Sequence, residues 1–219
     1  MAIAFSEYGI RNTITALKNT VTPTVAATTN CVALVWVECA NAGIDPDTVT
    51  FAGVGLTKLN TVTVVTRATQ CSLWGGSIGN LTSGTKTVEA TFSTSRSSSM
   101  MWASYSGATQ TVSASTWQQS TNTGTNTNDV TTALIPAVAN SWLVMCSIDL
   151  AASRTVGAGT TARYDGGNWQ IADSNSPLAL VSQTLAYTLG SSAVFGNNAV
   201  ILQEATASSS SNSGFFNIL

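Results

Sequence analysis

The chain of 219 residues carries 8 basic and 10 acidic side chains, has a formal net charge of -2 and contains no histidine. Acid–base catalysis needs groups that titrate near neutral pH, so this composition disfavours an enzyme and excludes a serine triad with a histidine base. The basic residues are scattered singly and no run approaches about 20 apolar residues. We therefore expect no cofactor, no metal, no nucleic-acid partner and no membrane partner.

Residues 1–30 carry scattered apolar side chains ahead of the first strongly β-like run. The spacing of Ile10 and Ile14 suits a helical turn, although neighbouring threonines disfavour a helix. We interpret residues 1–30 as an N-terminal arm. Two alternatives remain open at this point: the arm binds a partner, with Ile3 and Phe5 as contacts, or it forms an edge strand of the domain itself.

From Cys31 the pattern becomes that of β-strands. Residues 31–37 are almost continuously apolar and rich in β-branched side chains, which is typical of a central strand buried on both faces. Between residues 142 and 150 apolar side chains recur at every second position, which predicts a strand with one buried face. Further strands, separated by turn residues, are predicted at 49–53, 56–59, 62–66, 70–74, 86–92, 100–106, 130–134, 168–172, 178–189 and 198–202. The pattern predicts an all-β fold, an antiparallel β-sandwich or barrel, over residues 31–205.

Residues 113–129 are almost entirely Ser, Thr, Asn and Gln, and Trp117 is the one aromatic residue among them. We interpret this stretch as a long exposed loop in which Trp117 is a candidate receptor or surface contact. The other tryptophans of the chain lie in or beside predicted strands, where core packing explains them.

Few other side chains are candidates for catalysis, metal binding or disulfide formation. The cysteines are dispersed, and we interpret them as buried thiols rather than as disulfides or metal ligands: Cys31, Cys39, Cys71 and Cys146. Asp45 and Asp47 flank a proline in a predicted turn, which is favoured over a calcium site. Asp165 and Asp173 would form an acid pair only if the fold brought them together.

The chain after residue 205 has an unusual composition. A linker dominated by serine, at residues 208–213, precedes a peptide with four large apolar side chains. Such a peptide is unfavourable when exposed to water, so we expect it to fold back on its own domain or to dock on another subunit. The length of the linker favours another subunit. The predicted assembly contacts are Ile3, Phe5, Phe215, Phe216, Ile218 and Leu219.

A series of segments carries a resemblance that no single motif would support: VTFAGVGLTKL at 49–59, SLW at 72–74, GTKTVEATF at 84–92, WASYSGATQT at 102–111 and NSWLV at 140–144. Their order and spacing resemble a β-sandwich domain that recurs in structural proteins of tailed bacteriophages and in some bacterial surface proteins. The likeness covers residues 31–204. It implies a jelly-roll-like sandwich and brings no catalytic residue to carry over.

The resemblance implies a non-enzymatic virion protein, assembled in the host cytoplasm. We expect a capsid decoration or cement protein whose partners are copies of itself, as a trimer, and other virion proteins such as the major capsid protein. The alternative is a tail-fibre or surface adhesin module that binds a host glycan or receptor through the loop around Trp117. A fibre usually has a coiled-coil or repetitive stem, and the sequence shows neither heptads nor repeats.

Overall fold

Fifteen β-strands make up the regular structure of the described part of this chain. The computed structural model describes residues 2–41, 43–64, 66, 68–111, 117–149 and 153–205. The strands are β1 (Ala4–Val21), β2 (Thr24–Val25), β3 (Thr28–Cys39), β4 (Thr48–Phe51), β5 (Val54–Gly55), β6 (Thr57–Val64), β7 (Thr69–Leu81), β8 (Gly84–Thr85), β9 (Val88–Ser106), β10 (Gln119–Leu134), β11 (Trp142–Asp149), β12 (Arg154–Val156), β13 (Thr161–Gly166), β14 (Trp169–Asp173) and β15 (Gln183–Leu202). Among these residues no helix has the length and apolar character that a membrane crossing requires.

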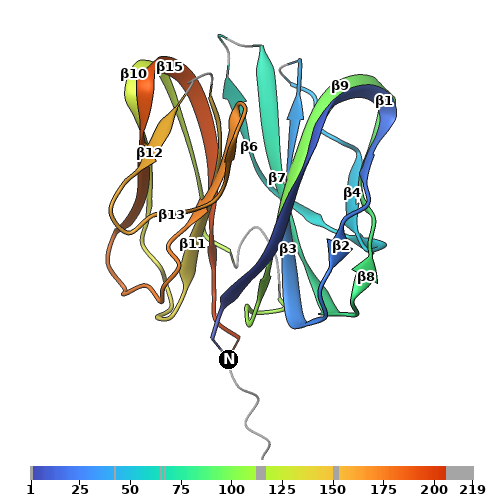
Figure 1. Cartoon of the computed structure of the whole chain (residues 1–219), viewed down its shortest axis with the longest axis horizontal. Helices are drawn as coiled ribbons and strands as arrows, with labels where there is room; N and C mark the ends of the chain where they lie inside the picture. Colours follow the sequence, from blue (N-terminus) through green and yellow to red (C-terminus); the bar gives the residue numbers. More distant parts are fainter. Residues whose placement is uncertain are drawn as a thin grey trace, which may run out of the picture.

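Two antiparallel sheets face each other (Figure 1). The larger sheet has the order β5-β4-β9-β3-β7-β6, and β1 pairs with β9 outside this path. The smaller sheet has the order β10-β15-β11-β14-β13, and β12 pairs with β15. Strands β2 and β8 form a separate short pair. The prediction of an all-β antiparallel sandwich is confirmed, while the jelly-roll order of its strands stays a prediction.

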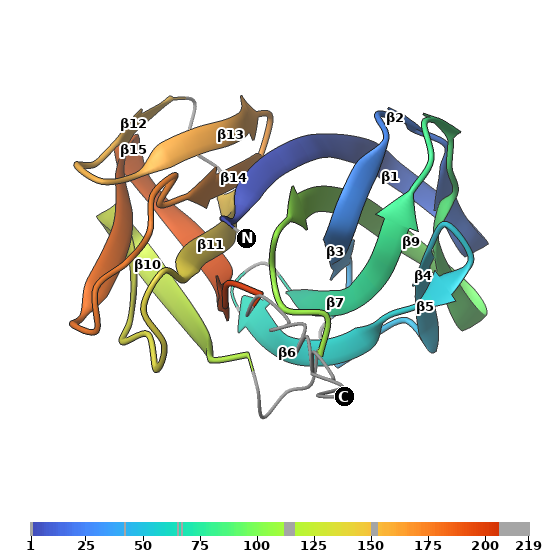
Figure 2. The ribbon, with the colours of Figure 1, turned by 90° about the horizontal axis from the view of Figure 1, so that it is seen from below.

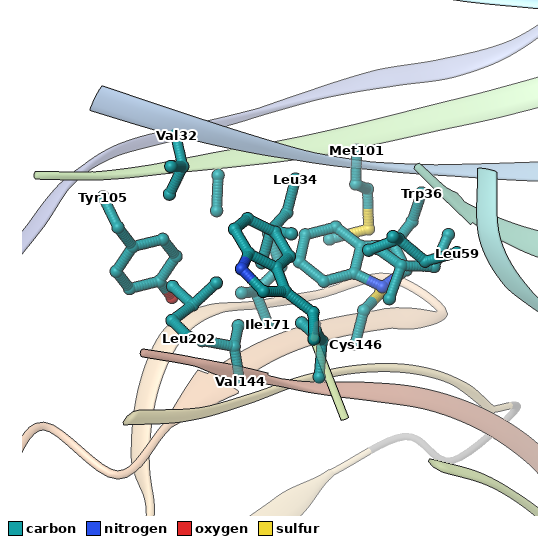
Figure 3. Close-up of a cluster of buried hydrophobic side chains, with 14 of the residues drawn as sticks. Val32, Leu34, Trp36, Leu59, Met101, Tyr105, Val144, Cys146, Ile171 and Leu202 are labelled. Atoms are coloured by element: carbon teal, nitrogen blue, oxygen red, sulfur yellow. The ribbon is translucent and has the colours of Figure 1, made fainter. Parts of the chain in front are cut away.

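The central core lies between the two sheets and explains why they pack together. Alternate residues of β3, namely Val32, Leu34 and Trp36, point towards Val144 of β11 and Leu202 of β15 (Figure 3). Each of these side chains is at most 1% exposed. Burying an aliphatic or aromatic side chain of this size contributes about 1.5–3 kcal/mol, so this cluster is a main source of the stability of the sandwich.

A second core covers the outer face of the larger sheet. Ala33, Val35 and Val37, which alternate along β3 with the residues of the central core, pack there with Phe51 of β4 and Trp102 of β9. Strand β9 bends, so that its first residues pair with β4 while its last residues pair with β3 (Figure 2). The prediction that residues 31–37 form a central strand buried on both faces is confirmed.

A third core covers the outer face of the smaller sheet. Leu185 and Tyr187, from the first half of β15, cover Leu143 and Met145 of β11. Every residue of β11 is consequently buried. The prediction of a half-buried strand at residues 142–150 is therefore wrong, because the bent pair of β10 and β15 covers the face that a flat sheet would leave in water.

The N-terminal segment is a strand of the domain. Strand β1 follows β9 along its whole length, from the pair of Ala4 with Ser106 to the pair of Val21 with Val88. Residues 4–21 are thus an edge strand, and neither the helical turn nor a free arm describes them. Threonines in this segment favour the extended backbone, and the partner that fixes it lies far along the chain.

The polar stretch at residues 113–129 is not one long loop. Strand β10 begins at Gln119, and its residues up to Gly124 pair with β15 down to Phe195. Threonine has a branched side chain that suits a pleated strand, so a Thr-rich polar run can form a sheet strand without apolar alternation. The loop prediction is therefore wrong from Gln119 onward.

The prediction of buried thiols is confirmed, because Cys31, Cys39, Cys71 and Cys146 are all free and buried. Burial raises the pKa of Cys31 to about 11 and that of Cys39 to about 12. We expect the folded chain to gain no mass from iodoacetamide at pH 8, and the chain unfolded in urea to gain one adduct at each cysteine, by mass spectrometry. Modification of any cysteine before unfolding would contradict this prediction.

Candidate functional site

Trp117 does not lie on the surface. It is 0% exposed and belongs to the central core, together with Leu34 and Leu59. A Cβ atom placed on Gly75 would lie 3.0 Å from Cζ3 of Trp117, so the glycine leaves room for the indole ring. The prediction of a receptor contact at Trp117 is therefore wrong. Burial of a large apolar ring is more favourable than its exposure, so the sequence alone could have predicted a buried Trp117.

The two candidate acids, Asp165 and Asp173, do not form a catalytic pair. On the ladder of β13 and β14, Asp165 pairs with Gln170 near the turn, whereas Asp173 pairs with Thr161 at the far end. Each carboxylate accepts hydrogen bonds from a different arginine. Throughout the described ranges, no group of three or more His, Cys, Asp or Glu side chains is placed to hold a metal ion.

Asp173 is instead the centre of a buried polar cluster. Its carboxylate, with no exposed surface, accepts hydrogen bonds from Nε of Arg163 at 2.7 Å and from the Tyr105 hydroxyl at 3.0 Å. Cζ of Arg163 lies 4.6 Å from the ring centroid of Phe5 and 5.9 Å from that of Trp142. Phe5, a predicted assembly contact, is thus half-buried against the cluster, which ties β1 to both sheets.

Burial raises the pKa of Asp173 above its ordinary value of 3.8, although hydrogen bonds from Arg163, Tyr105 and the backbone of Asn175 oppose the shift. The folded chain then holds this proton more tightly than the unfolded chain, so the contribution of Asp173 to stability falls as pH rises through the raised pKa. We expect the difference in unfolding free energy between the native chain and Asp173→Asn to shrink as pH rises above 3.8. Urea unfolding at several pH values measures it, and a difference that grows would contradict the raised pKa.

A second buried ion pair holds the other end of the smaller sheet. The Arg154 side chain is 3% exposed and donates from Nε and Nη2 to the two oxygens of Asp149, at 2.9 and 2.8 Å. Nη1 donates to Asp165 at 2.7 Å, and Nη2 also donates to the carbonyl of Gly167 at 3.0 Å. Burial opposes the charge of Arg154, but the hydrogen bonds and charges of Asp149 and Asp165 outweigh it and raise its pKa. Both arginines therefore have structural partners.

Exposed apolar side chains gather on two loops at one end of the smaller sheet. The loops join because the backbone N–H of Leu178 donates to the carbonyl of Ser141 at 2.9 Å. Their exposed large apolar side chains are Ile135 (57%), Val138 (44%), Leu180 (56%) and Val181 (60%). We call these four residues and the hollow described next the apolar end face. A cluster of this kind marks an interaction surface more often than scattered exposed residues do.

A hollow of about 290 Å³ adjoins these loops. It is lined by Ala2, Ile3, Asn140, Trp142, Pro177 and Glu204. Figure 2 looks onto this end of the molecule, where the N-terminus lies. The last described residues lie beside the hollow, because Glu204 lines it, and the N–H of the next residue, Ala205, donates to the carbonyl of Gly107 at 2.8 Å. The end of the domain and the start of the C-terminal segment thus meet at one place.

The predicted assembly contacts fall into two groups. Ile3 is 5% exposed, lines the hollow and contributes to the central core. Phe215, Phe216, Ile218 and Leu219 lie outside the described residues. Sequence reasoning missed the exposed residues of the apolar end face, although each loop carries an apolar run beside a proline, at Pro136 and Pro177. A proline next to a predicted strand end is the signal that places such a run in a loop.

Comparison with known proteins gives little beyond the fold class. No family model matches the sequence, and no curated protein matches it. Among solved structures, the chain is similar to the major capsid protein P2 of bacteriophage PM2, with 10% identity, a TM-score of 0.31 and coverage of 94% of this chain and 99% of that one. A phage major capsid protein is therefore a structural neighbour of this β-sandwich, at a similarity too low to carry an argument about function.

Proposed function

We propose that the chain is a non-enzymatic virion structural protein, and specifically a capsid decoration or cement protein that holds neighbouring subunits together. The apolar end face carries this proposal, because Ile135, Val138, Leu180 and Val181 expose 44–60% of their surface on two loops that join each other. Covering them on another protein removes apolar surface from water. The serial resemblance of residues 31–204 to virion proteins of tailed phages supports the same role.

The strand edges of the larger sheet support lateral contacts. Strand β1 pairs with β9 on one side and with no other strand among the residues that the structure describes. An edge of 18 residues offers backbone groups to a neighbouring subunit, and the composition, with 8% charged residues, provides few charges that would prevent such pairing. The proposed partners are copies of this chain, as a trimer, and a major capsid protein.

The prediction that tests this role is a deletion of residues 214–219. We expect the shortened chain to keep the unfolding midpoint of the full chain and to be incorporated into particles about tenfold less, because the deletion removes the apolar side chains proposed to bind a neighbour. A tenfold change corresponds to about 1.4 kcal/mol of binding free energy. Quantitative mass spectrometry of purified particles measures incorporation, and thermal unfolding provides the control. Incorporation at the level of the full chain would refute cementing by the tail.

The place of the protein in the particle is tested by cryo-electron microscopy of assembled virions. Density for the sandwich on the capsid lattice, in contact with the capsid subunits, would support decoration. Density restricted to the tip of a tail would refute it and would favour receptor binding.

The structure provides less support for the alternative function, glycan binding. Trp117 is buried, and another hollow, about 380 Å³ in volume, is lined by the aromatic residues Tyr164 and Trp169 together with Ile10, glycines and polar residues. Trp169 is 6% exposed, and the ring of Tyr164 contacts that of Tyr8 with centroids 5.5 Å apart. These rings therefore offer little open face on which a sugar could stack.

A further inference from the structure

We propose that the apolar end face of one copy is the receptor for the C-terminal peptide, residues 215–219, of a neighbouring copy. This inference rests on the proposed function and names the two surfaces that would join subunits. The peptide brings Phe215, Phe216, Ile218 and Leu219 and no charged side chain. Binding of this peptide to the apolar end face of the next copy would link copies in an open chain or close them into a ring.

The chemistry of the two surfaces matches. The hollow has walls of Ile3, Trp142 and Pro177, and Glu204 is the charged residue among the described residues that line it. Burying Phe, Ile and Leu side chains removes apolar surface from water, while the loss of rigid-body freedom and the ordering of the peptide cost much of this gain. We therefore expect a dissociation constant no tighter than the micromolar range.

The point where the chain leaves the domain favours a neighbouring copy over the same copy. Glu204 lines the hollow, and Ala205 is held at Gly107, so a tail that filled its own hollow would need only a short turn. Residues 206–214 separate Ala205 from Phe215. A spacer of this length extends to roughly 30 Å, which suits a span between subunits.

The apolar end face also stands out from the rest of the described surface. The other exposed large apolar side chains in this part of the chain are Tyr8, Leu17, Val54 and Val156. Tyr8 and Leu17 lie far apart on β1, Val54 lies on β5 and Val156 on β12. They do not form a second cluster on two adjoining loops, and they therefore provide matched control positions.

Binding is tested with the full-length chain. The receptor carries Phe215→Ser and Phe216→Ser, so that its own tail does not compete, and the probe is a fluorescein-labelled peptide of residues 206–219. We expect micromolar binding by fluorescence anisotropy, at least tenfold weaker binding when Leu180→Ser and Val181→Ser are added, and unchanged binding when Leu17→Ser and Val156→Ser are added instead. Absence of peptide binding, or equal loss in both sets, would overturn the inference.

The source of the tail is tested by mixing two variants. One carries Leu180→Ser and Val181→Ser and keeps its tail, and the other carries Phe215→Ser and Phe216→Ser and keeps the apolar end face. We expect the mixture to form a one-to-one complex by analytical ultracentrifugation, while each variant alone stays a monomer. The native chain is the deciding sample: if the tail occupied the hollow of its own copy, the native chain would stay a monomer at concentrations at which this mixture associates, and the inference would fail.

These outcomes are separable from the proposed function. If the peptide does not bind the apolar end face but the 214–219 deletion still reduces incorporation into particles, the inference fails while the cement role stands, with the tail docked on another virion protein. If the peptide binds in trans but the deletion incorporates normally, the inference stands and cementing by the tail fails.

Discussion

Replacing Arg154 with methionine is expected to lower the free energy of unfolding by about 3–5 kcal/mol. Methionine keeps the apolar stem but removes the charge, so Asp149, which has no exposed surface, would lose the two hydrogen bonds that Arg154 donates to its carboxylate. An ionised carboxylate that loses its charge-compensating arginine is costly in a buried site. Urea unfolding followed by far-UV circular dichroism measures the loss.

Two controls make this prediction specific. Lys18→Met removes an exposed ion pair, in which the side chains of Lys18 and Glu89 are 60% and 26% exposed, and should cost at most about 1 kcal/mol. The double variant Arg154→Met with Asp149→Leu removes both charges and should recover much of the stability. A loss below about 1 kcal/mol for Arg154→Met would show that the buried pair does not hold the sheet.

Replacing Trp117 with alanine is expected to destabilise the fold by about 3–5 kcal/mol, the usual cost of truncating a buried aromatic side chain. The ring lies between the two sheets, with Gly75 and Leu59 close by, and its removal would leave a cavity in the central core. The thermal midpoint should fall accordingly, as measured by differential scanning calorimetry.

Trp117→Phe is the matched control. Nε1 of Trp117 has no hydrogen-bond partner within the described ranges, so phenylalanine forfeits no bond there and keeps part of the packing. We expect its loss to be clearly smaller than that of alanine. A Trp117→Ala chain with native stability would mean that the ring is not part of the core and would reopen its role at the surface.

The fold class followed from the sequence because the main signal is local. The run of apolar, β-branched residues at Cys31–Val37 predicted a doubly buried strand, and β3 confirms it. The errors concern strands whose burial depends on distant segments. The polar face of β11 with Ser147 and Asp149 is covered by β10 and the first half of β15, and no local pattern reveals that cover.

The candidate site was less accessible to sequence reasoning. Ile3 and Phe5 were predicted to be assembly contacts, and the structure shows that both pack against their own domain, Phe5 on Tyr105 and Ile3 at the hollow beside Trp142. The apolar end face arises because the loops that carry Val138 and Leu180 meet through Ser141 and Leu178. This contact between the two loops depends on the tertiary structure, so the sequence of either loop alone does not predict it.

The order of strands in the smaller sheet has a consequence for synthesis. Strand β15, the last of the described strands in the chain, lies between β10 and β11 and pairs with both. Strand β11 can pair with β14 beforehand, but β10 and the other edge of β11 wait for β15, the last of these strands to leave the ribosome. Proteins dominated by such long-range pairings fold slowly and expose strand edges meanwhile. Production at low temperature, where translation and aggregation are slower, should accordingly give the better yield of folded chain.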